Sequence, residues 1–544
     1  MFLTMNVKRC VYISLLCLFL YTTARGQTFT SSDLPILLIN TGGQPIINEP
    51  KIRATLTLID NETGKRNHIT DKPALTSPIG IELRGSSSQD FFPKKPYGFE
   101  LRDSGGSNSV KLSLVGMPAE SDWILNPTYN DKTLLREALA YDLNRRISRY
   151  YTPRFRYCEV VLNNGYDGLY LLQEKIKRDK NRVDITSIKK TDLSGDALTG
   201  GYLLKIDKFE GSMSESWMSA QAGRNTKQVN ILIDRPKPAD LALEQFQYIK
   251  QYVTDFETAL AGDAFADPTN GYARYLDVES AVDYMLLTEL CRNVDGYRLS
   301  TFFYKDRDSR NGKLTMGPIW DYNLAFANAS YCNADKPEGW AYQFNEVCPN
   351  DPYPQPFWWE RLLQDPAFAA RLNNRYQTLR QGVLATPRIH AYLDSTGKSI
   401  TDARIRNFTR WPVIGTQLWP NDFVGKTYED EVNYLKDWVT KRLAWLDGAM
   451  PQLATEPALT LLISPNPTAE TVTVRYQLDQ RTDVRLVLTD LQGRRLFSTE
   501  VMNQEPGPHA YTVPPGQLPT GPGVYLLTVQ ATGYRQATRR VVRY

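Results

Sequence analysis

One stretch of the sequence constrains the fold more than any other: residues 293–323, NVDGYRLSTFFYKDRDSRNGKLTMGPIWDYN. It contains two runs with strand character, residues 298–304 and 313–319, separated by the turn-forming residues DRDSRNG. This pattern predicts a β-hairpin. Because the strands of a hairpin are antiparallel and lie about 4.8 Å apart, the residue that enters the first strand and the residue that leaves the second emerge at the same end.

The hairpin predicts that two acids, Asp295 and Asp321, are neighbours in space although they are distant in sequence. Asn293 and Asn323 flank them as further oxygen ligands. Such a set suits a hard cation such as Mg²⁺, which takes one or two carboxylates together with substrate phosphates. The alternative interpretation is an exposed hairpin whose ends carry solvated aspartates, since turns favour Asp and Asn. The aromatic residues around Asp321 favour a partly buried cluster.

Residues 1–26 have the organisation of a targeting segment. Lys8 and Arg9 precede an apolar run at residues 10–21, and the small-residue pattern before Gln27 is typical of a cleavage site. We therefore expect an exported protein. The run is too short to span a bilayer and no other stretch approaches 18 apolar residues, so no transmembrane segment is expected after signal removal.

The cysteines agree with export, and the charge distribution argues against a nucleic-acid partner. Cys332 and Cys348 bracket a polar loop, where an oxidising compartment favours a disulfide, and Cys158 in an apolar strand is expected to be a buried thiol. The formal net charge is +4, but the signal segment carries +3, and residues 463–544 also carry +3, nine arginines against six acids. The remaining charge is 4 − 3 − 3 = −2, so no basic nucleic-acid surface is expected.

The first part of the mature chain is rich in strands. Between residues 34 and 83, short apolar runs alternate with Gly, Asn and Pro turns, and strands at residues 79–84 and 97–102 flank a Gly/Ser-rich loop. The backbone of this loop can offer N–H groups to an anion, and Arg84, Lys94 and Lys95 supply positive charge nearby. A solvated turn is the alternative interpretation.

Helical and strand patterns then alternate before the composition changes. Apolar spacing predicts helices at about residues 132–147, 240–262 and 275–291, and a further hairpin ends at Glu174. Mainly helical patterns follow Phe326. The predicted organisation is a signal segment (1–26), an α+β domain (27–450), a linker (451–458) and a small all-β sandwich (459–544).

Residue types exclude several catalytic chemistries. Only three histidines are present, and the motifs of zinc proteases and of serine or cysteine hydrolases are missing. What remains is acid, amide and lysine chemistry. It could serve phosphoryl transfer around a metal ion or glycoside hydrolysis by two carboxylates, and residue types alone do not separate these.

Several blocks in order resemble the CotH-like kinases, an atypical protein kinase family. Over roughly residues 30–450 they are LPILLINT, IELRGSSSQDFFPKKPYGFE, DWILNPTYNDKTLLRE, EVVLNNGYDGLYLLQEKIKRDKNRVDI, GGYLLKID, NVDGYRLSTFFYKD and GPIWDYNLAF. The resemblance implies an atypical kinase-like fold that uses ATP and Mg²⁺. It implies that Asp295 is the catalytic acid that accepts the hydroxyl proton of a Ser or Thr substrate, and that Asp321 binds Mg²⁺.

The resemblance also assigns residues to nucleotide binding. Arg84, Lys94 and Lys95 would lie at the nucleotide phosphates, and Glu174 would pair with one of these lysines.

Three positions depart from the pattern of the family. Asn323 stands where many members have Asp, Glu137 where Asn is common, and Ala327 where Gly usually follows the aromatic residue. An amide oxygen at position 323 still ligates Mg²⁺. The departures keep a second hypothesis open, a non-catalytic structural or binding protein of the cell surface that retains the kinase-like scaffold.

The C-terminal region resembles a second family. ISPNPTAETVTV, DLQGRRL and GVYLLTV with a basic end are similar to the sorting domain of type IX secretion substrates of Bacteroidetes, an immunoglobulin-like sandwich. The resemblance implies recognition by the type IX machinery and a secreted or outer-membrane surface location. The expected substrate is then another exported protein.

Overall fold

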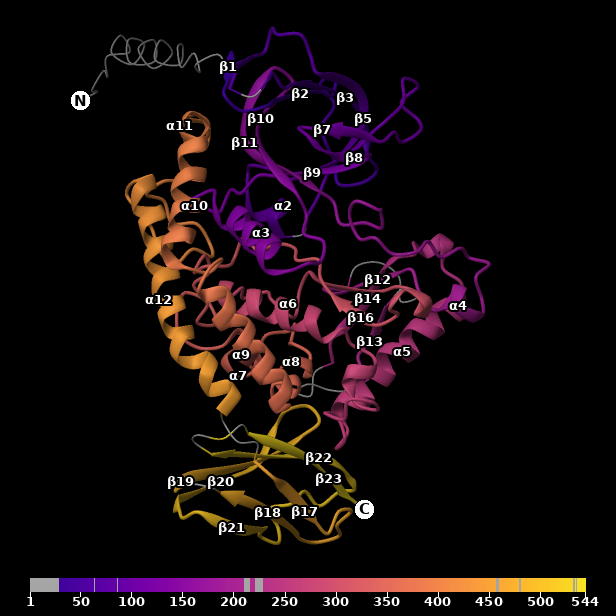
Figure 1. The fold of residues 1–544 in the computed structure, drawn as a ribbon, viewed down its shortest axis with the longest axis vertical. Coiled ribbons are helices and arrows are strands. Elements are labelled where there is room, and N and C mark those ends of the chain that lie inside the picture. The colour runs from indigo at the N-terminus through magenta and orange to yellow at the C-terminus, as the bar shows by residue number, and fades with distance from the viewer. Residues whose placement is uncertain are drawn as a thin grey trace, which may run out of the picture. The chain divides into compact units, whose positions relative to one another are not determined.

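The computed structural model describes residues 29–544 except residues 63, 86, 210–215, 221–227, 456–458, 479–480, 532–533 and 535. The predicted signal segment lies outside the described residues. The chain contains both helices and strands, as the α+β class requires, and the described part after Thr455 contains strands alone (Figure 1). The chain forms two compact units, one made of Met1–Pro127, Arg156–Leu172 and Ile400–Trp411 and the other of the remaining segments.

The first unit is built on a closed β-barrel. Its strands follow one another around the barrel in the order β10 (Phe155–Leu162), β11 (Gly165–Glu174), β9 (Asp122–Asn126), β6 (Tyr97–Leu101), β5 (Leu75–Leu83), β3 (Ile52–Ile59) and β2 (Ile36–Asn40). Parallel pairing of β10 with β2, from Glu159 opposite Ile36 to Leu162 opposite Ile39, closes the barrel. Smaller elements of this unit are β1 (Ser31–Ser32), β4 (Asn67–His68), β7 (Leu112–Leu114), β8 (Met117–Glu120), α2 (Ser87–Phe91) and α11 (Thr401–Arg410).

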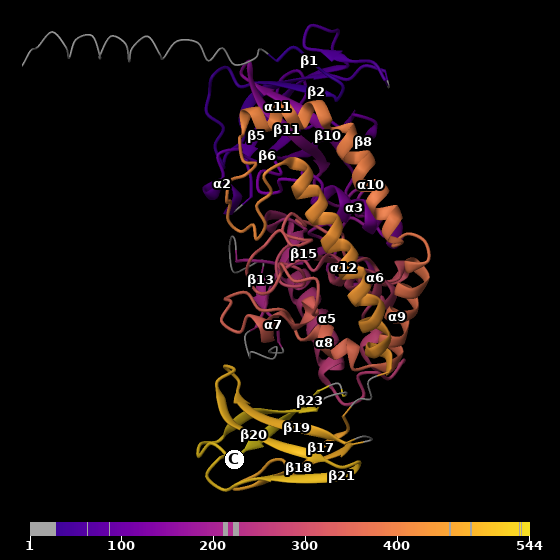
Figure 2. The same ribbon diagram turned by 90° about the vertical axis from the view of Figure 1, so that its left-hand side faces the viewer.

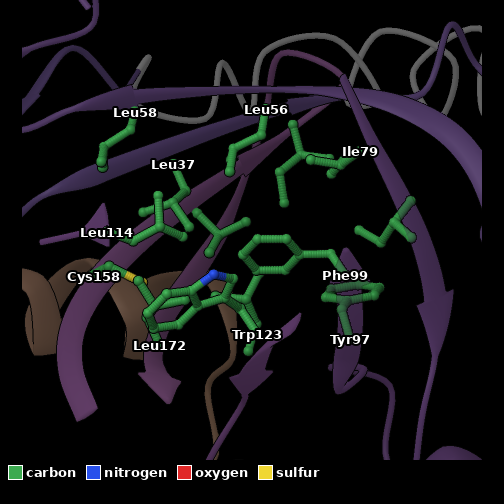
Figure 3. Close-up of a cluster of buried hydrophobic side chains, with 14 of the residues drawn as sticks. Leu37, Leu56, Leu58, Ile79, Tyr97, Phe99, Leu114, Trp123, Cys158 and Leu172 are labelled. Carbon is green, nitrogen blue, oxygen red and sulfur yellow. The ribbon is translucent and has the colours of Figure 1, made fainter. Parts of the chain in front are cut away.

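Alternating apolar residues fill the barrel, because successive side chains of a strand point to opposite faces. Figure 3 shows Leu56, Phe99 and Trp123 converging in this core, and all three are at most 1% exposed. The Trp123 indole donates a hydrogen bond to the carbonyl oxygen of Glu120 at 2.9 Å, which satisfies its only polar group. Cys158 lies in the same core as a free thiol, as predicted.

The second unit contains a five-stranded sheet in the order β13 (Ser216–Met218), β14 (Asn230–Arg235), β12 (Tyr202–Ile206), β15 (Thr301–Lys305) and β16 (Leu314–Met316). The predicted hairpin is confirmed: β15 and β16 are antiparallel, with Phe303 opposite Met316 and Lys305 opposite Leu314. Thr301 and Met316 therefore mark its open end, from which the chain leads back to Asp295 and on to Asp321.

Most of the helices of the chain lie in the second unit. They are α3 (Arg136–Ile147), α4 (Gly195–Leu198), α5 (Leu243–Ala261), α6 (Val278–Cys291), α7 (Phe344–Val347), α8 (Trp358–Leu363), α9 (Pro366–Arg380), α10 (Thr386–Ser399) and α12 (Tyr428–Thr455). The long helix α12 packs against α9, α10 and α6, and Figure 2 shows it beside α9. Along the described residues, no helix combines the length and apolar character needed to cross a membrane.

Two boundaries differ from the sequence expectation. Helix α3 begins at Arg136 and not near 132, because the Asp131 carboxylate accepts hydrogen bonds from the Thr133 and Arg136 N–H groups and holds residues 131–135 in a turn. Helix α12 continues to Thr455, so residues 451–455 are helical although they were assigned to the linker. Burial of Leu453 continues the apolar face of the helix beyond Pro451.

The C-terminal region forms two antiparallel sheets. One has the order β17 (Leu461–Ser464), β18 (Val472–Leu478), β21 (Gly507–Val513), and the other β20 (Arg495–Gln504), β19 (Thr482–Asp490), β22 (Gly523–Ala531), β23 (Ala537–Arg543). Both contribute to one hydrophobic core, whose members all lie between Leu459 and Val541. The immunoglobulin-like assignment and the sorting role stay predictions.

The predicted disulfide between Cys332 and Cys348 is present, with Cα atoms 5.6 Å apart and a sequence separation of 16. It borders a small cluster in which Val294, Leu324 and Phe344 pack together. Val294 precedes Asp295 and Leu324 follows Asn323. The disulfide therefore stabilises the two segments that carry Asp295 and Asn323.

Replacing Cys332 and Cys348 together by Ser should lower the free energy of unfolding by about 3 kcal/mol, because the bond closes a loop of this length in the unfolded chain. Urea unfolding of the oxidised protein measures the change. A reductant should destabilise the wild type by a similar amount and leave the double variant unchanged. Equal stability of the wild type with and without reductant would contradict the prediction.

Candidate active site

Asp295 lies in the loop between α6 and β15. Helix α6 ends at Cys291, and the left-handed backbone of the next residue, Arg292 (φ 44°), turns the chain into this loop. The Arg298 guanidinium donates to Asp295 Oδ1 at 2.7 Å and to Asp351 Oδ1 at 2.9 Å, and it stacks 4.1 Å from the centre of the Phe344 ring. Arg298 therefore fixes the orientation of the Asp295 carboxylate.

The environment of Asp295 favours its protonated form more than water does. Burial raises the pKa of this carboxyl group; Arg298 and Lys208 oppose the rise, and Asp351 and Asp207 add to it. The side chain keeps 22% of its surface exposed, so a substrate can approach it. A partly exposed carboxylate with a raised pKa has the properties of a general base.

A cavity of about 320 Å³ lies beside Arg298 in the second unit. Its lining is mainly apolar and includes Trp217, Met218, Tyr353 and Pro354. Because Arg298 contacts both the cavity and Asp295, a group bound there would lie near the predicted base.

A buried ion pair between Glu289 and Arg442 stabilises the loop that carries Asp295. Glu289 accepts hydrogen bonds from the Tyr297 hydroxyl at 3.0 Å and from the Ala341 N–H at 2.7 Å. Arg442 of α12 lies 3.6 Å from the Glu289 carboxylate and donates to the Gly339 carbonyl oxygen at 2.7 Å. Glu289 and Arg442 are both fully buried, so they link α6 and α12 to this loop rigidly.

Asp321 lies in a loop whose backbone is unusual. Asp321, Phe326 and Ala327 all have positive φ angles, 61°, 53° and 62°, a region that L-residues other than Asn and Asp enter rarely. Such backbone conformations cluster at functional sites, where the surrounding structure maintains them. The Asp321 side chain is exposed, whereas Phe326 and Ala327 are buried.

Amide side chains hold this loop against the segment that precedes α3. Asn323 Nδ2 donates to Asn130 Oδ1 at 3.4 Å, and Asn328 Nδ2 donates to the Asn323 carbonyl oxygen at 2.8 Å and to the Asn130 carbonyl oxygen at 3.3 Å. The other polar atom of the Asn323 side chain is its oxygen, which is the atom that a hard cation takes.

A buried ion pair makes a second connection. Arg136 Nη1 donates to Asp131 Oδ1 at 2.7 Å, and Arg136 Nε donates to the Phe326 carbonyl oxygen at 3.2 Å. The first turn of α3 is thereby attached to the loop that contains Asp321.

Glu137, the next residue of α3, belongs to this site although the sequence did not assign it there. It is 1% exposed. Burial raises its pKa to about 8, and the charge of Asp321 contributes the next largest effect. The sequence held one signal: Glu137 lies on the same helical face as Tyr141, where a buried charged residue is rare.

The structure separates the predicted site residues into groups. Asp321 and Asn323 share one loop, and burial and the charge of Asp321 both raise the pKa of Glu137. Asp295 has a different set of charged neighbours, led by Arg298. Glu174 is buried and pairs with Arg154 at 3.0 Å and Arg182 at 3.9 Å, where the resemblance implied a lysine.

The three predicted phosphate ligands all lie in the first unit. The Arg84 N–H donates to the Pro96 carbonyl oxygen, and the Lys95 ammonium donates to the Gln89 carbonyl oxygen. Lys94 is 1% exposed. Its ammonium group donates to the carbonyl oxygens of Pro127 and Leu169 and to Asn407 Oδ1 at 2.8, 2.5 and 2.9 Å.

These contacts occupy all three hydrogens of the Lys94 ammonium group. Lys94 would have to leave them to bind a phosphate, and its assignment as a phosphate ligand stays a prediction. Burial lowers the pKa of this amine to about 7, and the charge of Asp167 opposes the shift.

Similarity to a known family covers the central part of the chain. A family model described as CotH kinase protein matches residues 81–446. No curated protein matches the sequence. Among solved structures, dimeric latent PorU from Porphyromonas gingivalis is 19% identical, with 16% of this chain and 9% of that chain covered and a TM-score of 0.14.

Two further solved structures have similarly low scores. The alkylpurine DNA glycosylase AlkC of Pseudomonas fluorescens is 11% identical, with 34% of this chain and 53% of that chain covered and a TM-score of 0.12. The twitchin kinase region of C. elegans is 10% identical, with 95% and 99% covered and a TM-score of 0.12.

The buried amine of Lys94 predicts a pH dependence of stability. An unfolded lysine has a pKa of about 10.4, so between about pH 7 and that value the unfolded chain binds more protons than the folded protein. The Lys94 amine should therefore increase the free energy of unfolding of wild type as pH rises, by at most about 1.4 kcal/mol per pH unit. Lys94→Met should lack this gain.

Urea unfolding at pH 7, 8 and 9 tests the prediction, with Lys95→Met as the matched control because Lys95 is its half-buried neighbour. The Lys95→Met variant should follow wild type. Parallel pH profiles of wild type and Lys94→Met would show the prediction to be wrong.

Proposed function

The chain belongs to the CotH kinase protein family, and on that premise we propose that it transfers the γ-phosphoryl group of ATP to Ser or Thr hydroxyls of exported proteins. The observation that supports this most directly is the β15–β16 hairpin, whose open end leads to one acid on each side, Asp295 and Asp321. In phosphoryl transfer, catalysis is mostly positioning and charge stabilisation, which a rigid hairpin with two acids can supply.

Asp295 acts as the base in this proposal. Its carboxylate, oriented by Arg298, accepts the proton of the substrate hydroxyl while the hydroxyl oxygen forms a bond to the γ-phosphorus. The bond from that phosphorus to the β,γ-bridging oxygen breaks, and ADP leaves. The mainly apolar cavity beside Arg298 suits an apolar side chain of the acceptor protein near the hydroxyl.

Asp321 and Asn323 would hold Mg²⁺. The donor set fits the ion, because Glu137, whose pKa is raised by burial and by the charge of Asp321, has two buried carboxylate oxygens without a hydrogen-bond partner among the described residues. When bound, Mg²⁺ neutralises charge on the nucleotide phosphates. Asp321 and Asn323 orient the ion; the loop that carries them is fixed by Asn130 and Arg136.

The location that we propose is outside the cytoplasm, at the cell surface or beyond it. The targeting pattern of residues 1–26 and the sorting-domain pattern of residues 459–544 support export through the type IX machinery. The Cys332–Cys348 disulfide agrees with an oxidising compartment.

Transfer of labelled phosphate from ATP tests the catalytic proposal. Purified wild type with Mg²⁺ should label a Ser- or Thr-containing acceptor, and Asp295→Asn should lower kcat by about 10²- to 10⁴-fold, because the amide cannot accept the proton. Glu279→Gln is a control, since Glu279 is an exposed acid of α6 that pairs with Arg371 at the surface. Equal labelling by wild type and Asp295→Asn would contradict the assignment of the base.

A second candidate function is a surface protein that binds a nucleotide or another anion without turnover. The absence of turnover in this function agrees with Lys94, whose three donors are already used inside the first unit and do not hold a transferring phosphate there. Thermal unfolding distinguishes the two functions: a nucleotide at 100 times its dissociation constant should stabilise the protein by about 2.7 kcal/mol. Stabilisation without transfer would support the binding function, and transfer would rule it out.

A further inference from the structure

Glu137 is an exception among the buried glutamates of the second unit. Neither of its carboxylate oxygens has a hydrogen-bond partner among the described residues. The Tyr141 hydroxyl and the Tyr322 N–H lie close enough to lower its pKa, but they form no hydrogen bond of normal geometry with it. Buried polar groups are nearly always paired, and an unpaired buried carboxylate is costly.

Three other glutamates of the unit show what a structural buried carboxylate looks like here. Glu174, Glu257 and Glu289 are each 0% exposed. Glu174 accepts hydrogen bonds from Tyr151 and Arg154, Glu257 from Ser219, Ala220 and Trp358, and Glu289 from Tyr297, Ala341 and Tyr342. Within the described part of the chain, Glu137 therefore lacks the hydrogen-bond donors that these three buried glutamates have.

Another acid is near enough to act on Glu137. The charge of Asp321 acts on it, and two carboxylates side by side repel each other when both are ionised. The fold nevertheless maintains this arrangement: Arg136, the residue before Glu137, is hydrogen-bonded to the carbonyl oxygen of Phe326 at 3.2 Å. Asn323 of the same loop contacts Asn130 at 3.4 Å.

A divalent cation would resolve both the missing partner and the repulsion. We propose that Glu137 is a carboxylate ligand of the same Mg²⁺ ion as Asp321, so that the ion is held by two carboxylates, with Asn323 supplying a neutral oxygen. This inference rests on the proposed function for the ion at Asp321 and adds a ligand from α3. Two carboxylates are within the number that a Mg²⁺ site with a phosphate substrate normally has.

Metal binding without nucleotide tests the inference separately from catalysis. Isothermal titration of the full chain with MgCl₂, and with MnCl₂ as a second ion, gives the affinity, and thermal unfolding with and without metal gives an independent readout. Glu137→Gln keeps the size of the side chain and removes its charge. It should weaken metal binding by about 10-fold or more, since loss of an outer partner of a ligand already costs that much, and the metal-induced rise in Tm should shrink accordingly.

Asp321→Asn should weaken metal binding in the same way, whereas Glu257→Gln, which removes a buried carboxylate that is fully hydrogen-bonded, should leave it unchanged. Without metal, Glu137→Gln should be about as stable as wild type, because the carboxyl group that it removes has no hydrogen-bond partner among the described residues. Metal affinity of Glu137→Gln equal to wild type, with Asp321→Asn weakened, would overturn the role of Glu137 and leave the proposed kinase site intact. A wild type that binds neither ion would also overturn it.

Discussion

The candidate site depends on one buried ion pair, between Asp131 and Arg136. Asp131 shapes the turn before α3 through its hydrogen bonds to Thr133 and Arg136, and Arg136 reaches the carbonyl oxygen of Phe326. Removing one partner of such a pair leaves a charge buried without compensation, at a cost of about 3–5 kcal/mol. The pair therefore determines where α3 begins, and it presents Glu137 to the loop of Asp321.

The sequence predicts the strands near the site, but it does not predict which groups surround the acids. The β15–β16 hairpin was predictable because two strand-like runs flank a cluster of turn residues, and the observed register places its open end as expected. The orientation of Asp295 was not predictable. It depends on Arg298, which is held by Asp351 and Phe344, about fifty residues further along the chain. The Asp295–Asp321 proximity inferred from the hairpin stays a prediction.

Burial accounts for what the sequence could not show about the charged residues. Lys94 was assigned to phosphate binding because it follows a Gly/Ser-rich loop, but its ammonium group is enclosed with Asn407, a residue more than three hundred positions away in sequence. Glu137 was noted only as a departure from the family pattern. A charged residue on an apolar helix face does not by itself show whether the fold pairs it with another group. The missing partner of Glu137 is inferred to be a cation only because Asp321 acts on Glu137 in the folded protein.

The C-terminal sheets carry a hydrophobic core made only from residues 459–541. Among the described residues, no side chain of the barrel or of the helices belongs to that core, so the tail has the character of a separate module. Removal of the tail would leave both the barrel core and the acids that flank the hairpin with their own packing. The same tail could follow an unrelated domain, so its presence by itself carries no information about the chemistry of the rest of the chain.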